Sequence, residues 1–274
     1  MNIHKQRAER VNLRQLTERT TSDEPLSNVE QAAIQGLWRT ALHHPSNSRI
    51  EAGSGIRLIT SGWAGWLRCA ADGRRLIFLF LMPGDYVIPG LFNVHDCDLI
   101  CLTPVRTVDA SPLVEGGPTT APQSAAMIER SGLRYRRLLL DHLTRLTLGS
   151  TTSSLALLLL EFHERSLQSG ACVKGRFSLP IGQRMLAAAL GRSTVQVNKV
   201  ISKFQTFGLI RVGYDWLEVV DPDGLQSLSG MPPQSQALSN PVRAVSAPPA
   251  SRQSAPVHNQ ENLQSVMKVK HSRL

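Results

Sequence analysis

The sequence predicts an α+β fold: a group of short strands, one long helix, and then two short helices followed by a pair of strands. Three observations predict it. Apolar runs separated by glycines fill residues 49–112, apolar residues recur at three- and four-residue steps over residues 125–148, and a glycine separates two short helical patterns within residues 182–208. Strands first and helices afterwards are typical of the α+β class.

The composition is that of a globular protein of about two domains. The chain has 274 residues, of which 42% are hydrophobic and 19% charged. Its longest uninterrupted apolar runs, Leu76–Met82 and Leu155–Leu160, are much shorter than the roughly 18 residues of a membrane span. The first residues lack the apolar stretch of a signal peptide, and the four cysteines lack the spacing of a disulfide framework. We therefore expect a cytoplasmic protein.

Positive charge is concentrated in one part of the chain. The net charge is +9, and residues 171–220 hold seven Lys or Arg residues against Asp215 and Glu218. A basic cluster of this kind is a common footprint of nucleic-acid binding, since phosphates need cationic partners. Charge alone leaves an ordinary solvated surface as an equal alternative.

The beginning of the chain predicts an arm and a helix. Residues 1–24 are polar and without apolar periodicity, so we expect them to be disordered. Apolar residues recur at helical spacing over Pro25–Leu42, and Ser27 with Glu30 three residues later is a capping-box pair. We expect this helix to begin at about Ser27 and to end at Leu42.

Residues 49–112 predict a small barrel or roll of short strands. Asp72-Gly73 lies between two apolar runs and is a strong hairpin signal, and Pro83-Gly84-Asp85 marks another turn. The expected strands are Ile56–Leu58, Trp63–Leu67, Leu76–Met82, Tyr86–Ile88, Leu99–Leu102 and Val105–Val108.

A Gly/Pro/Thr linker at residues 115–124 leads into a long helix, Ala125–Leu148, and a second helix, Thr152–Leu167, follows Gly149-Ser150. The apolar stripe of the long helix is too long for one small domain to cover, so we expect it to pair with the same stripe of a second copy. The stripe consists of Ile128, Tyr135, Leu138, Leu139, Leu143 and Leu146, and the polar face carries Arg130, Arg134, Arg137, Asp141 and Arg145.

The segment from Gly182 to Phe204 predicts two helices joined by a tight turn. The first helix spans Gly182–Leu190, and Ala187 is small enough for a second helix to approach closely. Gly191 allows the left-handed backbone that such a turn needs, and Ser193 is a good helix cap. The buried stripe of the second helix falls at i, i+3, i+4 and i+7, at Val197, Val200, Ile201 and Phe204.

The opposite face of the second helix presents a mostly polar set: Thr194, Val195, Gln196, Asn198, Lys199, Ser202 and Lys203. Leu209–Val212 and Trp216–Val220 then predict a two-stranded wing after Gly208. This layout is typical of a helix-turn-helix whose second helix enters the major groove of DNA. An amphipathic helix pair of unrelated purpose is the alternative, which the capping, turn and wing signals disfavour.

Residues 60–228 resemble the cyclic-AMP receptor/fumarate-nitrate regulator (CRP/FNR) family of bacterial transcription factors. The resemblance is carried by SGWAGWLRCAADGRRLIFLFLMPGDYV, by the helix ending LTRLTLG, and by LAAALGRSTVQVNKVISKFQTFGLI. It implies a cyclic-nucleotide-binding-like β-roll, a dimerisation helix and a C-terminal winged helix-turn-helix. The expected division is a disordered arm at 1–24, the roll with its N-terminal helix at 25–122, the dimerisation helix at 123–149, the winged helix-turn-helix at 150–228 and a disordered tail at 229–274.

The chain departs from the family pattern in four places. Residues 49–62 are short for the first hairpin of the roll, and the cysteine cluster of the iron–sulfur members is missing from the amino-terminal part. Members that bind cyclic nucleotide hold the phosphate with an Arg-Ser pair before a strand, and His95 and Asp96 take that place here. Asp96 would repel a phosphate. Arg192 occupies a turn position that is usually apolar, from which it could reach a DNA phosphate.

Other chemistry has weak support. His95 with Cys97 does not complete a metal site, and Cys97 and Cys101, four residues apart on a strand, lie too far apart for a disulfide. Trp63 and Trp66 are better explained as core residues than as the lining of a pocket. Nucleophile–base motifs and phosphate-binding loops are missing, so we predict no enzyme, no cofactor and no metal.

The sequence therefore predicts a homodimeric transcription regulator that recognises an inverted repeat in double-stranded DNA and is not gated by cyclic nucleotide. RNA polymerase is a further candidate partner. Two alternatives remain: a small-molecule sensor or protein-interaction module with a degenerate helix-turn-helix, and a cupin-like enzyme, which would need a metal triad that the sequence lacks. The expected phosphate contacts are Arg192, Ser193, Gln196 and Lys203, the best base-edge candidate is Lys199, and the DNA-facing set is completed by Thr194, Val195 and Asn198.

Overall fold

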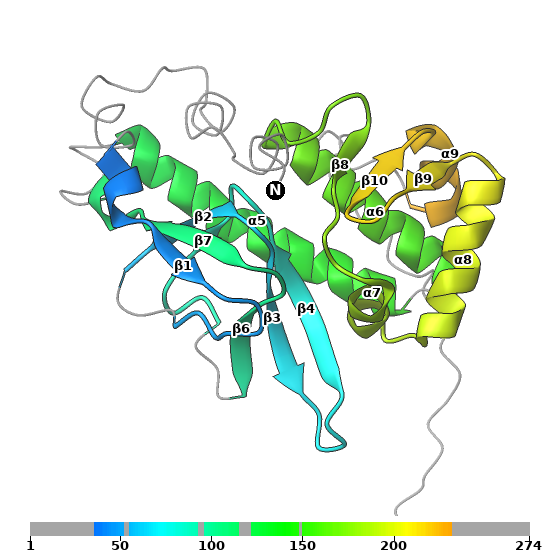
Figure 1. The fold of residues 1–274 in the computed structure, drawn as a ribbon, viewed down its shortest axis with the longest axis horizontal. Helices are drawn as coiled ribbons and strands as arrows, with labels where there is room; N and C mark the ends of the chain where they lie inside the picture. Colours follow the sequence, from blue (N-terminus) through cyan, green and yellow to red (C-terminus); the bar gives the residue numbers. More distant parts are fainter. Residues whose placement is uncertain (1–35, 52–54, 93–95, 115–121, 148–149, 232–274) are drawn as a thin grey trace, which may run out of the picture. The chain divides into compact units, whose positions relative to one another are not determined.

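Seven short strands form the amino-terminal part of the fold in the residues that the structure describes (Figure 1). The computed structural model describes residues 36–51, 55–92, 96–114, 122–147 and 150–231, so the expected arm (1–24) and nearly all of the expected tail (229–274) lie outside the described residues. The strands form two antiparallel sheets, of order β1-β7-β2-β5 and β4-β3-β6. They are β1 (Leu42–His44), β2 (Arg57–Ser61), β3 (Ala64–Cys69), β4 (Arg75–Leu81), β5 (Tyr86–Val87), β6 (Cys97–Cys101) and β7 (Val105–Asp109).

Both expected turns are confirmed. The β3–β4 hairpin turns at Asp72-Gly73, where Asp72 Oδ1 accepts the backbone N–H of Arg74 at 3.0 Å and Gly73 has φ +78°. This is the Asx-type turn that the Asp-Gly pair favours. At Pro83-Gly84-Asp85 the chain turns between β4 and β5, with Gly84 at φ +101° and the Asp85 N–H donating to Met82 O at 3.0 Å.

The helix expected to end at Leu42 is wrong at its carboxyl end. Leu37–Thr40 is a 3₁₀ turn, η1, and β1 begins at Leu42, while residues up to 35 lie outside the described residues. The cause is a long-range contact: the Thr40 hydroxyl donates to Leu37 O at 2.7 Å and accepts the Asp109 N–H at 2.8 Å. That contact places the next residues beside β7, with which β1 pairs.

Two long helices follow the 3₁₀ turn η2 (Ser111–Leu113). Helix α5 spans Pro122–Thr147 and α6 spans Thr151–Gln168, close to the expected bounds. The Ser150 hydroxyl caps α6 by accepting the Ser153 N–H at 3.0 Å, as serine at this position favours. No helix within the described part of the chain is long and apolar enough to cross a membrane.

The carboxyl-terminal elements form further helices and a three-stranded sheet of order β8-β10-β9. The two wing strands were expected, whereas β8 and α9 were not, because β8 is a three-residue strand and α9 begins at a proline. Asp221 caps α9 by accepting the Gly224 N–H at 2.8 Å. The elements are β8 (Arg176–Ser178), α7 (Gln183–Leu190), α8 (Thr194–Thr206), β9 (Ile210–Val212), β10 (Trp216–Val219) and α9 (Pro222–Ser229).

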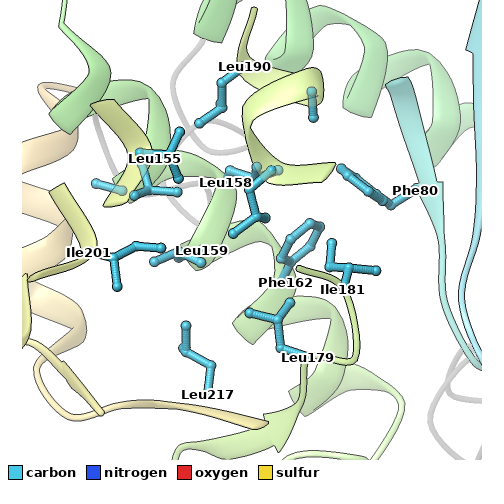
Figure 2. Packing of buried hydrophobic residues seen from close by; sticks show 14 of the residues in the cluster. Phe80, Leu155, Leu158, Leu159, Phe162, Leu179, Ile181, Leu190, Ile201 and Leu217 are labelled. Atoms are coloured by element: carbon cyan, nitrogen blue, oxygen red, sulfur yellow. The ribbon is translucent and has the colours of Figure 1, made fainter. Parts of the chain in front are cut away.

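One apolar core joins the helices of this part to strands β3 and β4 of the roll (Figure 2). The ring of Phe162, from α6, packs edge-on against Trp63 at 5.0 Å and against Phe80 at 5.2 Å between ring centroids. Figure 2 shows Phe80 beside Ile181 and Phe162, with Leu155, Leu158 and Leu159 lying along α6. Burying each such side chain stabilises the fold by about 1.5–3 kcal/mol.

Candidate nucleic-acid interface

The turn between α7 and α8 has the geometry that its residues predict. Gly191 adopts the left-handed conformation, with φ 60° and ψ 32°, and the next N–H, that of Arg192, donates to Ala187 O at 3.1 Å. Ser193 then caps α8 in a complete capping box with Gln196. Because both ends of the turn are fixed by local hydrogen bonds, the direction in which α8 leaves it is fixed as well.

The expected buried stripe of α8 is confirmed. Val197, Val200, Ile201 and Phe204 are all buried, and Leu186, Ala187 and Leu190 of α7 belong to the same core. Residues three and four apart share one face of a helix, so this packing directs the opposite face of α8 away from the core.

The expected DNA-facing residues lie on that opposite face. Ser193, Val195, Gln196, Asn198, Lys199 and Lys203 are exposed or partly exposed there, and Arg192 and Thr194 lie beside them at the turn. Val195 retains 63% of its surface. The Lys203 ammonium lies 5.7 Å from the centroid of the Phe207 ring. The structure thus gathers all eight residues on one turn and one helix face.

Six of the seven basic residues within residues 171–220 fall into three groups; the seventh is Lys174. Arg176 and Arg211 both pair with Glu218, at 3.1 and 3.0 Å, and Arg176 also stacks on Trp216 at 3.9 Å. Arg184, in the first turn of α7, and Arg192, in the α7–α8 turn, line the same groove, and Lys199 and Lys203 lie on α8. The wing arginines are therefore engaged in holding the sheet, and the positive charge of α8 is available to a ligand.

One apolar cluster of the roll contains residues of both of its sheets. Phe92 packs edge-on against Trp66 and Phe78, with centroids at 5.3 and 5.6 Å. Trp63 and Trp66 are both buried, which confirms them as core residues. Asp96 is exposed at φ +74° directly before β6, whereas His95 lies outside the described residues.

The cysteines offer no second centre within the described residues. Cys97 and Cys101 stand on the single strand β6 as free thiols, as do Cys69 and Cys172 elsewhere. Burial raises the pKa of the Cys101 thiol, so the reactive thiolate is disfavoured. Among the residues that the structure describes, no three His, Cys, Asp or Glu side chains are close enough to hold a metal ion.

Comparisons with known proteins agree with this geometry. Residues 154–228 match the model of the Crp-like helix-turn-helix domain. The chain is 25% identical over 162 residues to the nitrogen fixation regulation protein FixK of Bradyrhizobium diazoefficiens, an alignment that covers 58% of this chain and 67% of FixK. The fold is similar to that of FixK2 from Bradyrhizobium japonicum, with a TM-score of 0.59 and 21% identity over 71% of this chain and 98% of that one. It is also similar to a CRP/FNR-family transcriptional regulator of Thermus thermophilus, with a TM-score of 0.50 and 22% identity over 70% and 98% of the two chains.

Residues 154–228 belong to the Crp-like helix-turn-helix domain family, and the relatives and similar folds support membership of the chain in the CRP/FNR family. The family resemblance found in the sequence is thereby confirmed, together with the α+β fold and a DNA-binding transcription regulator as the general function. The matched helix-turn-helix lies in the segment where the residue pattern predicted it.

The sequence did not reveal a buried ion-pair chain, formed by Asp85, Arg134, Arg145, Glu161 and Arg165. Asp85, in the turn after β4, accepts from Arg134 of α5 at 2.6 Å and from Arg165 of α6. Glu161 accepts from Arg165 at 2.8 Å and from Arg145 at 2.5 Å. Arg145, expected on the polar face of the long helix, is buried because that face packs against the carboxylate of α6. The available signal was the i,i+4 pair of Glu161 and Arg165, which directly follows the apolar run Leu155–Leu160.

Proposed function

We propose that this CRP/FNR protein is a homodimeric regulator that binds an inverted repeat in double-stranded DNA and acts through that binding and not through catalysis. It would act in the cytoplasm, where its DNA lies, with RNA polymerase as a further partner. The observation that carries the proposal is the exposed face of α8. It combines a capped amino terminus, positive charge and polar side chains that can reach base edges on one side of a packed helix.

The proposed roles follow from the chemistry of each side chain. Lys199 lies near the middle of α8 and has no ion-pair partner among the described residues, so it serves as a donor to a base edge. Asn198 suits an adenine and Val195 suits a thymine methyl group. The Ser193 and Thr194 hydroxyls, with Arg192, Gln196 and Lys203, suit phosphates, which position the helix without reading sequence.

The second copy would pair through the outer face of α5. In one chain, Ile128, Tyr135 and Leu138 are buried against the roll. Four leucines on the same helix stay open to solvent: Leu133 at 54%, Leu140 at 64%, Leu143 at 57% and Leu146 at 43% of their surface. A helix rarely exposes so many large apolar side chains unless they are an interface. Of the expected stripe, three residues thus pack within the chain, Leu139 is partly buried, and Leu143 and Leu146 are exposed. Leu133 and Leu140, which were not expected in the stripe, extend the exposed face that we assign to the dimer.

Cyclic nucleotide is not proposed as the effector. A bound phosphate must be met by cations and donors once it leaves water. Asp96 opposes such a charge at the position before β6, and the Phe92 ring occupies space between Trp66 and Phe78 inside the roll. DNA binding should therefore proceed without cyclic AMP or cyclic GMP.

Selection of bound sequences from random duplex DNA tests the proposal. We expect an enriched inverted repeat whose half-sites are about one helical turn apart, since a two-fold dimer presents its two α8 helices to successive major grooves. The selection is repeated with cyclic AMP and cyclic GMP present, and neither should change the enriched site or its affinity. Failure to enrich any sequence would contradict DNA recognition, and enrichment of a single half-site would contradict the dimer.

A further inference from the structure

A groove of about 890 Å³ lies between the tip of the β3–β4 hairpin and the α7–α8 turn. The hairpin contributes Asp72 through Ile77, and the facing wall comes from α7, the turn and the first residues of α8. Among the described residues that line the groove, four are arginines and Asp72 is the one carboxylate; the arginines are Arg74, Arg75, Arg184 and Arg192. The groove is therefore strongly positive.

The hairpin arginines differ in how much of their charge is available. The Arg74 guanidinium donates to Asp72 Oδ2 at 2.6 Å, and its side chain remains 76% exposed. Arg75 begins β4 opposite Cys69, is exposed, and has no acidic partner among the described residues. Arg75 thus presents a full positive charge at the hairpin tip, whereas that of Arg74 is partly neutralised.

The other wall of the groove is the part of a helix-turn-helix that lies along the DNA backbone. In this motif the first helix crosses the phosphates while the second enters the major groove. Arg184 stands in the first turn of α7, and Ser193 and Thr194 stand at the start of α8, all of them lining the groove. A duplex held by α8 would therefore bring backbone phosphates to the same groove that the hairpin arginines border.

We propose that the hairpin tip, Asp72–Arg75, is a second DNA contact through which Arg75, assisted by Arg74, binds backbone phosphates outside the bases that α8 reads. The inference rests on the proposed function and extends it to a residue set in the roll. Double-stranded DNA carries one negative charge per roughly 1.7 Å of its axis, so a positive groove beside the recognition helix has a matching partner in the backbone. Contacts of this kind add affinity equally on every sequence and leave base discrimination to α8.

The salt dependence of binding tests the hairpin contact. Fluorescence anisotropy measures the affinity for a selected duplex and for a random-sequence duplex over a range of salt concentrations. The slope of log K against log salt is negative, and each lost phosphate contact makes it less steep by about 0.9. Arg75→Ala should flatten the slope by about that amount on both duplexes, which corresponds to a loss of affinity about threefold greater at ~50 mM than at ~200 mM salt.

Two further variants are measured beside Arg75→Ala: one that removes a negative charge from the groove and a control outside it. Asp72→Asn removes the one carboxylate among the described residues of the groove but keeps a side-chain oxygen that can accept the Arg74 N–H, so the turn is retained. It should bind both duplexes more tightly at low salt. Arg39→Ala removes an exposed arginine of η1, which does not line the groove, and should change neither affinity nor slope.

The outcomes separate this inference from the proposed function. If the salt slopes of Arg75→Ala and Asp72→Asn are unchanged while Lys199→Ala still weakens binding, only the hairpin contact is refuted. The positive groove would then be a site for a small anionic ligand and not for DNA. No binding of any duplex by the unaltered protein would overturn the proposed function itself. Equal losses for Arg75→Ala and Arg39→Ala would also refute the hairpin contact, because the effect would then be one of net charge.

Discussion

Replacing Arg165 with methionine should strongly destabilise the protein, since it interrupts the buried ion-pair chain. The Arg165 side chain is 6% exposed and faces Asp85 and Glu161, which are 4% and 3% exposed. It also donates to Phe80 O at 2.8 Å. Although burial by itself would lower the pKa of Arg165, the two carboxylates raise it, so the guanidinium stays charged at every usable pH. Methionine fills a similar volume without supplying charge or donors.

The size of the effect follows from what remains unpaired. Removing one partner of a buried ion pair typically costs about 3–5 kcal/mol, because the remaining charge stays buried. Here each carboxylate keeps a second arginine: Asp85 keeps Arg134 at 2.6 Å, and Glu161 keeps Arg145 at 2.5 Å. We therefore expect a loss near the lower end, about 3 kcal/mol, to which the unpaired Phe80 carbonyl adds about 1 kcal/mol.

Urea and thermal unfolding, followed by far-ultraviolet circular dichroism, measure this loss. A loss of about 4 kcal/mol corresponds to a melting temperature lower by roughly 8–16 °C for a chain of this size. The matched control is Arg49→Met, which breaks the Arg49–Asp98 pair, whose side chains are 64% and 39% exposed. That pair should contribute less than about 1 kcal/mol. If Arg165→Met cost no more than Arg49→Met, the buried chain would be structurally unimportant and the reasoning refuted.

Three further outcomes are expected. Burial and the nearby Arg145 lower the pKa of His142 to about 4, with Glu161 acting in the opposite direction. As the pH falls, His142 therefore takes up a proton in the unfolded chain before it does so in the folded protein. The free energy of unfolding should drop by about 1.4 kcal/mol per pH unit between pH ~6.5 and ~4. Urea unfolding across that window should show a shallower decline for His142→Leu than for the exposed control His43→Gln, and equal declines would contradict the shift. Sedimentation should find Leu140→Asp/Leu143→Asp monomeric, whereas Leu167→Asp, at an exposed leucine of α6, should keep the native assembly. Anisotropy titrations should show that Lys199→Ala costs about 1–3 kcal/mol of binding free energy and relaxes discrimination at one base position. Lys203→Ala should weaken binding to all sequences alike. If both variants bind like the unaltered protein, this face of α8 does not contact DNA.

The helix-turn-helix was predictable because every signal that defines it is local. Gly191 needs only its own backbone conformation, the Ser193 cap needs only Gln196, and the stripe of α8 repeats within one helix. The same holds for the Asp72-Gly73 hairpin, whose turn is closed by hydrogen bonds between residues only a few positions apart. Where local preferences and the fold agree, pattern and structure give the same answer.

The features that the sequence did not reveal depend on partners far along the chain. Arg165 and Asp85 are 80 residues apart, and Arg145 and Glu161 are 16 apart, so a polar-face pattern on α5 could not distinguish a solvated arginine from a buried one. The apolar stripe of α5 was ambiguous in the same way. Helical periodicity marks an apolar face but does not tell whether the same chain or a second copy covers it. Leu138 and Leu143 belong to the same expected stripe of α5, yet the first packs on the roll and the second faces solvent.

Burial of Arg145 and Arg165 is tolerated because Glu161 stands between them and accepts from both. This shared carboxylate ties α5 to α6, while Asp85 ties both helices to the turn after β4 through Arg134 and Arg165. Helix α6 in turn packs in the same apolar core as α8. A change at the turn after β4 therefore has a direct ionic path to the helices that support α8.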